Sequence, residues 1–338
     1  MITPIPRSTS CLVKRDAILK CAVPFLVLLI TGPLSVGQAA EYPTRQIRLI
    51  VPNSPGGNAD IVARLIGQRL SESVGQPVIV DNRPGASSII GTELAAKAPP
   101  DGYTILAVAQ PHTTNPSLAK QLPYDTARDF ATISLIASTP LVLVAHPSLP
   151  VKTLKDLIAL AKSKPGSLNY GTTGAANSGH LAGALLAFMA KIDLVLVSYR
   201  GTANALTDVL AGHVQLGFPA MTTVQQYLKM GKLRALGVTG IKRSSLAPDV
   251  PTISEAGVPG YQAGIWNGLM VPAGTPGPII DKLNGEIVRI LNSPETRERF
   301  AGMGADVTPS SPEKMRAFLE SETATWSKVI REAGIRSE

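Results

Sequence analysis

A strand, a glycine turn and the start of an amphipathic helix follow one another within residues 47–70. The first five of these residues are mostly apolar and have the length of a buried strand. Gly56-Gly57 lets the chain turn, and Asn58 is a favourable N-cap. Asp60 lies in the first helical turn, where the helix dipole favours an anion. Because such a turn directs unpaired backbone N–H groups at one place, the run predicts a site that holds an anion.

Strands and helices alternate along the rest of the chain, which predicts an α/β fold. The first three expected strands and the helices between them form a βαβαβ unit, which implies a parallel sheet with right-handed crossovers. Capping residues placed before prolines mark the last three helix starts. Further strands are expected at 77–82, 103–109, 132–137, 141–146, 168–172, 194–198, 214–218, 233–239 and 266–271, and helices at 87–98, 153–164, 177–190, 202–211 and 222–229 and from Thr275-Pro276, Ser293-Pro294 and Ser311-Pro312.

The first 39 residues have the order of a cleaved export signal. A basic leader is followed by an apolar stretch over 21–36 and by small residues that predict cleavage after Ala39. Pro24 interrupts the apolar stretch, which falls short of the roughly 20 residues that a membrane-spanning helix needs. We therefore expect an exported, periplasmic protein rather than a membrane-anchored one.

Both cysteines, Cys11 and Cys21, lie in this leader. The processed chain is therefore expected to have no disulfide, no thiolate metal site and no cysteine nucleophile. About 300 residues remain, which is enough for two ordinary domains. The formal charge of the whole chain is +8, and about +5 remains without the leader, which has four of the bases and one acid.

The sequence offers little for catalysis. The four histidines are scattered without a pair at metal-ligand spacing, and no phosphate-binding, dinucleotide-binding or hydrolase motif is present. Ser117 and Ser311 each begin an SxxK pattern, but neither has a companion motif. No run of Lys and Arg with interleaved aromatics occurs, which argues against a nucleic-acid partner. We expect no metal, no cofactor and no catalytic residue.

Three polar loops, 53–60, 172–177 and 200–204, each follow an expected strand and open an expected helix. Their hydroxyls, amides and helix N-termini suit a carboxylate held by hydrogen bonds without a buried cation. Each loop alone is compatible with an ordinary α/β turn, but three at successive strand ends lie where open α/β sheets place their ligands. We assign Asp60 to capping or water binding rather than to direct contact with an anion. The candidate ligand-binding residues are Asn53, Ser54, Pro55, Gly56, Gly57, Asn58, Asp60, Gln110, Thr172, Thr173, Gly174, Ala175, Ala176, Asn177, Thr202 and Asn204.

A set of longer landmarks extends over nearly all of the processed chain. They read YPTRQIRLIVPNSPGGNAD, DNRPGAS, PDGYTIL, LPYD, DFATIS, HLAG, VSYRG, GKLRALGVT, PDVPTISEAGVPGY and GLMVPAGTP. Together they resemble the Bug family, the extracytoplasmic solute receptors of tripartite tricarboxylate transporters. The resemblance implies an α/β, two-domain type II periplasmic binding protein (clamshell) fold. It also implies a ligand carboxylate held by the first and second loops, partly through water.

The chain departs from the family pattern at positions that bear on the ligand. If Ala176 adopts a positive φ, it is strained by about 1–2 kcal/mol where glycine would not be. Where the family usually has Phe-Pro, this chain has Asn53-Ser54, and where the family has Gly and Ser, it has Ala176-Asn177. Ala184 stands in place of an acidic residue, and Gln215 and Pro219 stand in place of aspartates.

We therefore expect domain one at about 41–140 plus 268–338 and domain two at about 141–267. The cleft between them is expected to bind a small organic acid, and the monomeric receptor to present it to the permease subunits of a membrane transporter. Two other classes stay open. One is a sensor component that reports ligand occupancy to a signalling partner, and the other is a hydrolase on a similar fold, which needs a base beside a nucleophile.

Overall fold

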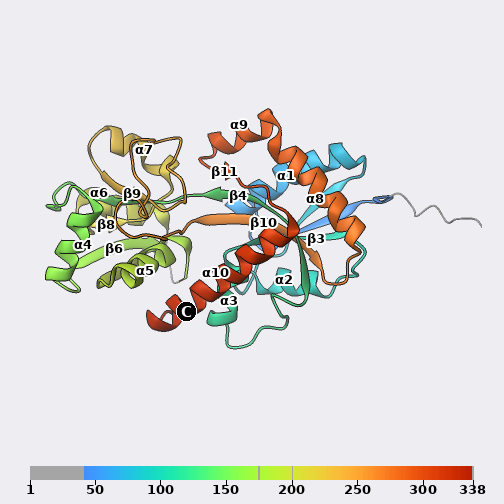
Figure 1. Ribbon diagram of the computed structural model, residues 1–338, viewed down its shortest axis with the longest axis horizontal. Helices are drawn as coiled ribbons and strands as arrows, with labels where there is room; N and C mark the ends of the chain where they lie inside the picture. Colours follow the sequence, from blue (N-terminus) through green and yellow to red (C-terminus); the bar gives the residue numbers. More distant parts are fainter. Residues whose placement is uncertain (1–41, 174–175, 200, 337–338) are drawn as a thin grey trace, which may run out of the picture. The chain divides into compact units, whose positions relative to one another are not determined.

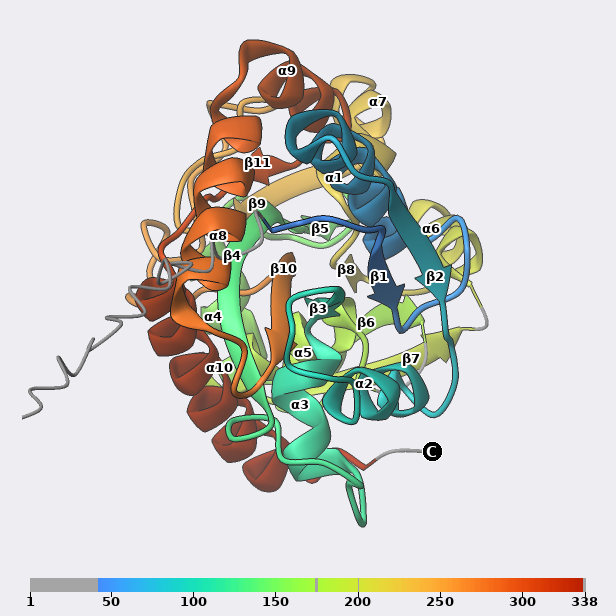
Figure 2. The same cartoon turned by 90° about the vertical axis from the view of Figure 1, so that its right-hand side faces the viewer.

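Two β-sheets covered by helices organise the chain (Figures 1 and 2). The computed structural model describes residues 42–173, 176–199 and 201–336. The first sheet combines strands from the beginning and the end of the chain in the order β11-β4-β10-β3-β1-β2. The second sheet is formed by the middle of the chain in the order β7-β6-β8-β5-β9. Within the described residues, no helix has both the length and the apolar character needed to cross a membrane.

The first sheet is mixed. β1 pairs in parallel with β2 and β3, as the βαβαβ pattern predicts, whereas β10 runs antiparallel to both β3 and β4. Because β1 and β3 are parallel neighbours, the segments that follow their carboxyl ends leave the sheet at one edge. Its strands are β1 (Ile47–Val51), β2 (Val78–Asn82), β3 (Thr104–Ala109), β4 (Phe130–Thr139), β10 (Ile265–Pro272) and β11 (Asp306–Val307).

The second sheet is also mixed. β6 pairs in parallel with β7 and β8, while β5 runs antiparallel to β8 and β9. The carboxyl ends of β6, β7 and β8 therefore share one edge, and a helix begins after each of them. Its strands are β5 (Val142–Ala145), β6 (Leu168–Thr173), β7 (Leu194–Tyr199), β8 (Leu216–Gly217) and β9 (Arg234–Val238).

Helices bury apolar side chains against both faces of the first sheet. On one face, α1, α8 and α9 contribute Ile66, Leu283 and Phe300 to the core, each with no exposed surface. On the other face, Ala95 of α2 and Met315 and Leu319 of α10 are buried in one core. α3 runs along α10. These helices are α1 (Asn58–Val74), α2 (Ile89–Ala96), α3 (Pro111–Leu118), α8 (Gly277–Asn292), α9 (Pro294–Gly302) and α10 (Pro312–Glu332).

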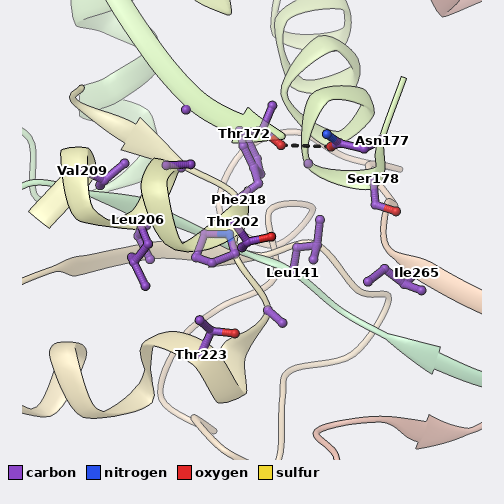
Figure 3. A pocket seen from close by; sticks show the side chains of 17 residues that line it. Leu141, Thr172, Asn177, Ser178, Thr202, Leu206, Val209, Phe218, Thr223 and Ile265 are labelled. Carbon is purple, nitrogen blue, oxygen red and sulfur yellow. Dashed lines mark hydrogen bonds between the residues drawn. The ribbon is translucent and has the colours of Figure 1, made fainter. Parts of the chain in front are cut away.

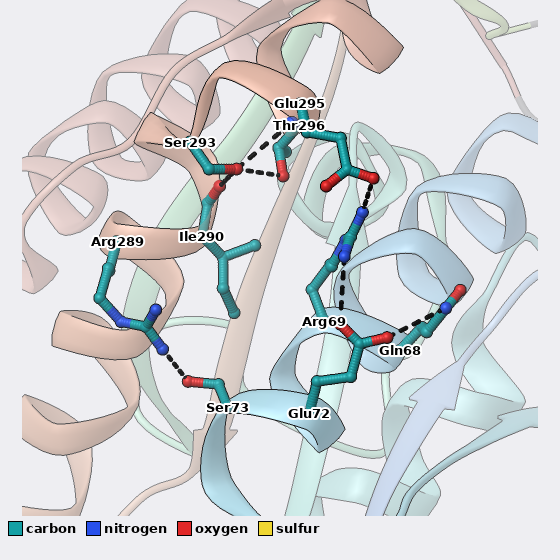
Figure 4. Close-up of polar contacts among 9 residues, drawn as sticks. All are labelled: Gln68, Arg69, Glu72, Ser73, Arg289, Ile290, Ser293, Glu295 and Thr296. Atoms are coloured by element: carbon teal, nitrogen blue, oxygen red, sulfur yellow. Dashed lines mark hydrogen bonds and ion pairs between the residues drawn. The ribbon is translucent and has the colours of Figure 1, made fainter.

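Polar side chains also join α1 to α8 and α9 (Figure 4). Arg69 of α1 pairs with Glu72 of its own helix and with Glu295 of α9. Arg289 of α8 donates to the hydroxyl of Ser73 on α1. Because the acids are mostly exposed and exposed ion pairs contribute only about 0–1 kcal/mol, the apolar contacts beneath them supply most of the stabilisation.

The second sheet has its own two cores. Leu157 of α4 and Leu181 of α5 are buried against one face. Val209 of α6 and Val224 of α7 are buried against the other. These helices are α4 (Leu154–Ser163), α5 (Ser178–Ala190), α6 (Thr202–Ala211) and α7 (Met221–Lys229).

The long C-terminal helix α10 contacts the cores of both sheets. Its first half places Met315 and Leu319 in the core of the first sheet. Its second half places Trp326 and Val329 in the core of the second sheet, beside α5. The chain therefore connects the two sheets three times, through β4–β5, through β9–β10 and along α10.

Several helix starts follow the capping signals in the sequence. Thr153 accepts from the N–H of Asp156, whose carboxylate accepts in return from the N–H of Thr153, which is a complete capping box. Ser293 and Ser311 cap α9 and α10, each followed by a proline at the first helical position. These three predicted starts are confirmed because a cap depends only on residues adjacent in sequence.

Two other predicted caps are wrong by one residue. α1 begins at Asn58 itself, and the N-cap is Gly57 in an extended conformation. α8 begins at Gly277 after Pro276, and Thr275 does not cap it. The hydroxyl of Thr275 instead donates to the carbonyl of Pro272 at 2.7 Å, which engages it in the turn before the helix.

Candidate functional site

A cavity of about 380 Å³ lies at the carboxyl edge of the second sheet (Figure 3). This volume falls within the roughly 300–1,000 Å³ of small-molecule sites. The ends of β6 and β8 and the starts of α5, α6 and α7 surround it, and the starts of β5 and β10 complete its wall. The lining residues are Leu141, Val144, Gly171, Thr172, Asn177, Ser178, Gly179, Thr202, Ala205, Leu206, Val209, Gly217, Phe218, Pro219, Ala220, Thr223 and Ile265.

Three helices begin at this cavity. Asn177 is the N-cap of α5, Thr202 is the first residue of α6, and Ala220 is the N-cap of α7, and all three line the cavity. The first N–H groups of a helix have no partner within it, and the helix dipole places partial positive charge there. Among the described residues that line the cavity, none is acidic or basic. The arrangement therefore favours an anion through uncharged donors.

A network of hydrogen bonds fixes the start of α5. The Oδ1 atom of Asn177 accepts both the hydroxyl of Thr172 and the backbone N–H of His180, each at 2.9 Å. Gly179 is so close that a Cβ atom there would lie 2.4 Å from the Oγ1 atom of Thr172. Thr172 and Asn177, two predicted site residues, are thus brought together by a cap rather than left facing solvent.

The loop before α5 is held by a second contact. The N–H of Ala176 donates to Nδ1 of His180 at 3.0 Å, and His180 is 8% exposed. Ala176 has φ +59°, so this alanine is in the left-handed region and the strain of about 1–2 kcal/mol applies. Burial lowers the pKa of His180, which keeps the ring neutral and able to accept.

Gln110 connects the first sheet with this cavity. It lies between β3 and α3 and is 6% exposed. Its Oε1 atom accepts the hydroxyl of Ser178, the first residue of α5, at 2.9 Å. Its carbonyl accepts the N–H of Thr113 and of Thr114, which fixes the start of α3. A side chain from the carboxyl edge of the first sheet thus contacts the cavity wall of the second.

The first loop is organised around Asp60, which is 3% exposed. Its carboxylate accepts the N–H of Gly56 at 2.8 Å, Nε of Arg64 at 3.0 Å and Nδ2 of Asn82 at 2.9 Å. Burial alone would raise the pKa of Asp60, but these three hydrogen bonds together lower it. Asp60 therefore holds the turn and the start of α1.

The turn after β2 is a feature that the sequence did not reveal. Ala86, Ser87 and Ser88 follow one another at φ +45°, +52° and +75°, so the predicted helix start at residue 87 is wrong. The amide of Asn115 donates to the carbonyl of Ser87 at 2.9 Å, and Thr92 donates to that of Ser88. Runs of left-handed residues without glycine are costly and cluster at functional sites, and no sequence signal marks this one.

The remaining predicted residues differ in their positions. Among the described residues that line the cavity, none comes from the first loop. The amide of Asn53 lies 3.5 Å from the hydroxyl of Ser88, and Asn204 is exposed on α6. Ser54, Pro55, Gly56, Gly57 and Asn58 are exposed at the carboxyl edge of the first sheet. Gly174, Ala175 and the side chain of Thr173 lie outside the described residues.

The fold and the cavity together define a solute-binding protein of two α/β domains. A sequence model described as "Tripartite tricarboxylate transporter family receptor" matches residues 62–335. The protein BugT of Bordetella pertussis is 36% identical over 309 residues, which cover 91% of this chain and 94% of BugT. The chain belongs to this family of receptors.

Two solved structures agree with this membership. One, described as "R. palustris Rpa4515 with adipate", has a TM-score of 0.70 and 37% identity and covers 88% of this chain and 100% of that one. The other, of the "periplasmic binding protein BugD", has a TM-score of 0.67 and 33% identity over 88% and 100% of the two chains. The matched proteins are solute receptors, and BugD is a periplasmic one.

Proposed function

We propose that this protein is a periplasmic receptor that captures a small organic carboxylate and delivers it to the permease subunits of a tripartite tricarboxylate-type transporter. The observation that carries the proposal is the convergence of three helix N-termini on a cavity whose described lining has no charged side chain. The similar protein Rpa4515 was solved with adipate, a dicarboxylate, which supports a carboxylate as the ligand class.

The cavity lining favours an acid with an apolar body. Thr172, Asn177 and Thr202 supply polar groups at the helix starts, while Leu206 and Phe218 supply apolar surface. An ammonium group finds no carboxylate among the described lining residues, so the proposed ligand is an organic acid rather than an amino acid.

We propose that the ligand is held between two domains, with bounds of about 41–140 plus 268–338 and 141–267. The proposed site combines the first loop, Gln110, the loop before α5 and the start of α6. The bond from Ser178 to Gln110 supports this pairing because it joins the carboxyl edges of the two sheets. We propose that Asp60 acts by holding the first loop, through its bond to Gly56, rather than by contact with the ligand.

The proposed receptor is exported and monomeric and does not convert its ligand. The order of basic, apolar and small residues before residue 40 supports export. Mass spectrometry of protein from the native compartment is expected to show a start at Ala40 or Glu41, and a full-length product would contradict export. Prolonged incubation with a bound acid, followed by NMR of the mixture, is expected to show no product.

A thermal-shift screen tests the ligand class. Adipate, benzoate, citrate and L-aspartate are added separately to the purified processed protein. An acid present at about 100 times its Kd adds about 2.7 kcal/mol to the free energy of unfolding and raises Tm. We expect at least one acid without an ammonium group to raise Tm and L-aspartate to have the smallest effect. A panel in which no carboxylate raises Tm would refute the proposed function.

A further inference from the structure

The loop before α5 is held by one imidazole. Nδ1 of His180 lies 3.0 Å from the backbone nitrogen of Ala176. Because a backbone N–H only donates, Nδ1 must be unprotonated and the ring proton must be on Nε2. The backbone N–H of His180 in turn donates to the cap side chain of Asn177. His180 therefore joins the last residue before the cap to the first turn of the helix.

Ala176 needs such a partner. It has φ +59°, a conformation that an alanine adopts only when neighbouring contacts enforce it. Protonation of Nδ1 would place an N–H opposite the N–H of Ala176 and replace attraction by repulsion. The left-handed conformation of Ala176 would then lose the contact that holds it, and Ala176 would be free to relax.

The surroundings of His180 contain little that would stabilise its charged form. The ring of Tyr170 on β6 lies beside it with centroids 6.4 Å apart, and burial raises the pKa of this phenol, which stays neutral. Of the charged groups on the packed helix α10, Lys328 lies over Phe188 and Glu322 accepts from Trp326. Gln110, at the start of α3, is uncharged and accepts the hydroxyl of Ser178, which lies two residues before His180.

We propose that His180 is a positioning residue for ligand capture, whose neutral imidazole holds Ala176 next to the cap of α5 and whose protonation releases Ala176 and weakens binding. The inference rests on the proposed function, because Ala176 and Asn177 are part of the proposed site. Burial lowers the pKa of His180 below its ordinary value of 6.5. The holding contact is therefore complete above that value and is lost as the pH falls through the lowered pKa.

The experiment compares five proteins, namely the unchanged protein, three single variants and one double variant, by calorimetry between about pH 5 and pH 8, the range in which histidine is the side chain that titrates. The probe is adipate, or another acid of the four-acid panel if it gives a larger thermal shift. His180→Asn keeps an acceptor near the position of Nδ1 but does not titrate. His180→Leu removes the acceptor. His213→Gln changes a histidine with a mostly exposed side chain at the end of α6 and serves as the control.

We expect the affinity of the unchanged protein and of His213→Gln to fall as the pH drops through the lowered pKa of His180, by about tenfold once the ring is fully protonated, the effect of one lost hydrogen bond. His180→Asn should bind as tightly at neutral pH but show only the pH dependence of the acid itself. His180→Leu should bind about tenfold more weakly at every pH, and adding Ala176→Gly should restore much of the loss. Glycine needs no partner at positive φ.

Two results would overturn the inference. The first is an affinity of His180→Asn that depends on pH as strongly as that of the unchanged protein. The second is an affinity of His180→Leu equal to that of the unchanged protein. A ligand-free measurement separates this failure from that of the proposed function. Nitrogen NMR of labelled histidine should show His180 with Nδ1 unprotonated at neutral pH, and a proton on Nδ1 would refute the inference even if acids bind.

Discussion

Asn177 allows stability and ligand binding to be changed separately. Its Oδ1 atom caps α5 and also accepts the hydroxyl of Thr172. Asn177→Ala removes both bonds. Loss of the cap costs about 1 kcal/mol, and loss of the bond to the hydroxyl costs about 1 kcal/mol more. The free energy of unfolding should therefore fall by about 2 kcal/mol and Tm by about 4 °C.

Asn177→Asp should leave stability unchanged but weaken binding. An aspartate keeps the acceptor at the N-cap, and the helix dipole favours its charge, so stability is retained. The same charge enters a cavity proposed to hold an anion. Two like charges about 5 Å apart repel by about 3 kcal/mol at an effective dielectric constant of about 20, which corresponds to a loss of affinity of about 100-fold.

Thermal denaturation and calorimetry with the acid identified by the screen measure the two effects. Asn177→Ser, which restores the residue usual in the family, should match the unchanged protein in stability. Thr325→Ala, on the exposed side of α10, should change neither quantity. If Asn177→Asp binds the acid as tightly as the unchanged protein, the carboxylate is not held at the start of α5. If Asn177→Ala is fully stable, the cap contributes nothing.

Further changes test packing and polar contacts at the site and elsewhere in the fold. Gly179→Ala should lower the free energy of unfolding by about 1 kcal/mol and weaken binding, because its Cβ would lie 2.4 Å from Oγ1 of Thr172. Gly285→Ala, in the open middle of α8, should instead raise the free energy of unfolding by up to about 1 kcal/mol. Equal urea midpoints for the two variants would contradict this expectation. Burial lowers the pKa of His112 from 6.5 to about 4. The free energy of unfolding should therefore fall by about 3 kcal/mol as the pH drops from about 6.5 to 4. In urea unfolding, His112→Gln should show a shallower dependence on pH. Asp60→Ala removes a buried carboxylate that accepts three hydrogen bonds and should cost about 2–3 kcal/mol. A loss below about 0.5 kcal/mol in the same assay would show that the first loop is held by other contacts.

The parts of the fold that were predictable depend on neighbours in sequence. The strand 47–51 agrees residue for residue because its apolar run is ended by Pro52. The caps at Thr153, Ser293 and Ser311 were visible because cap and helix are adjacent. α3 was missed because His112 and the polar residues after it show no helical period, although they are buried by contacts with distant segments.

The candidate site was predictable to a similar extent. Thr172, Asn177 and Thr202 line the cavity, and each begins or precedes a helix that the sequence indicates. The hydrogen bond between Gln110 and Ser178 joins residues 68 positions apart, so no local pattern indicates it. The left-handed turn at 86–88 was missed for another reason. Positive φ is normally signalled by glycine, and these residues are held there by tertiary contacts.

The chemistry of the cavity suits a protein that must release what it binds. A buried arginine paired with a carboxylate would give shorter and stronger hydrogen bonds, at the cost of slower release. Hydroxyls, an amide and helix N-termini provide weaker attraction, which favours release. The neutral imidazole of His180 is consistent with this design, because it accepts the N–H of Ala176 and so holds that residue without adding a fixed positive charge.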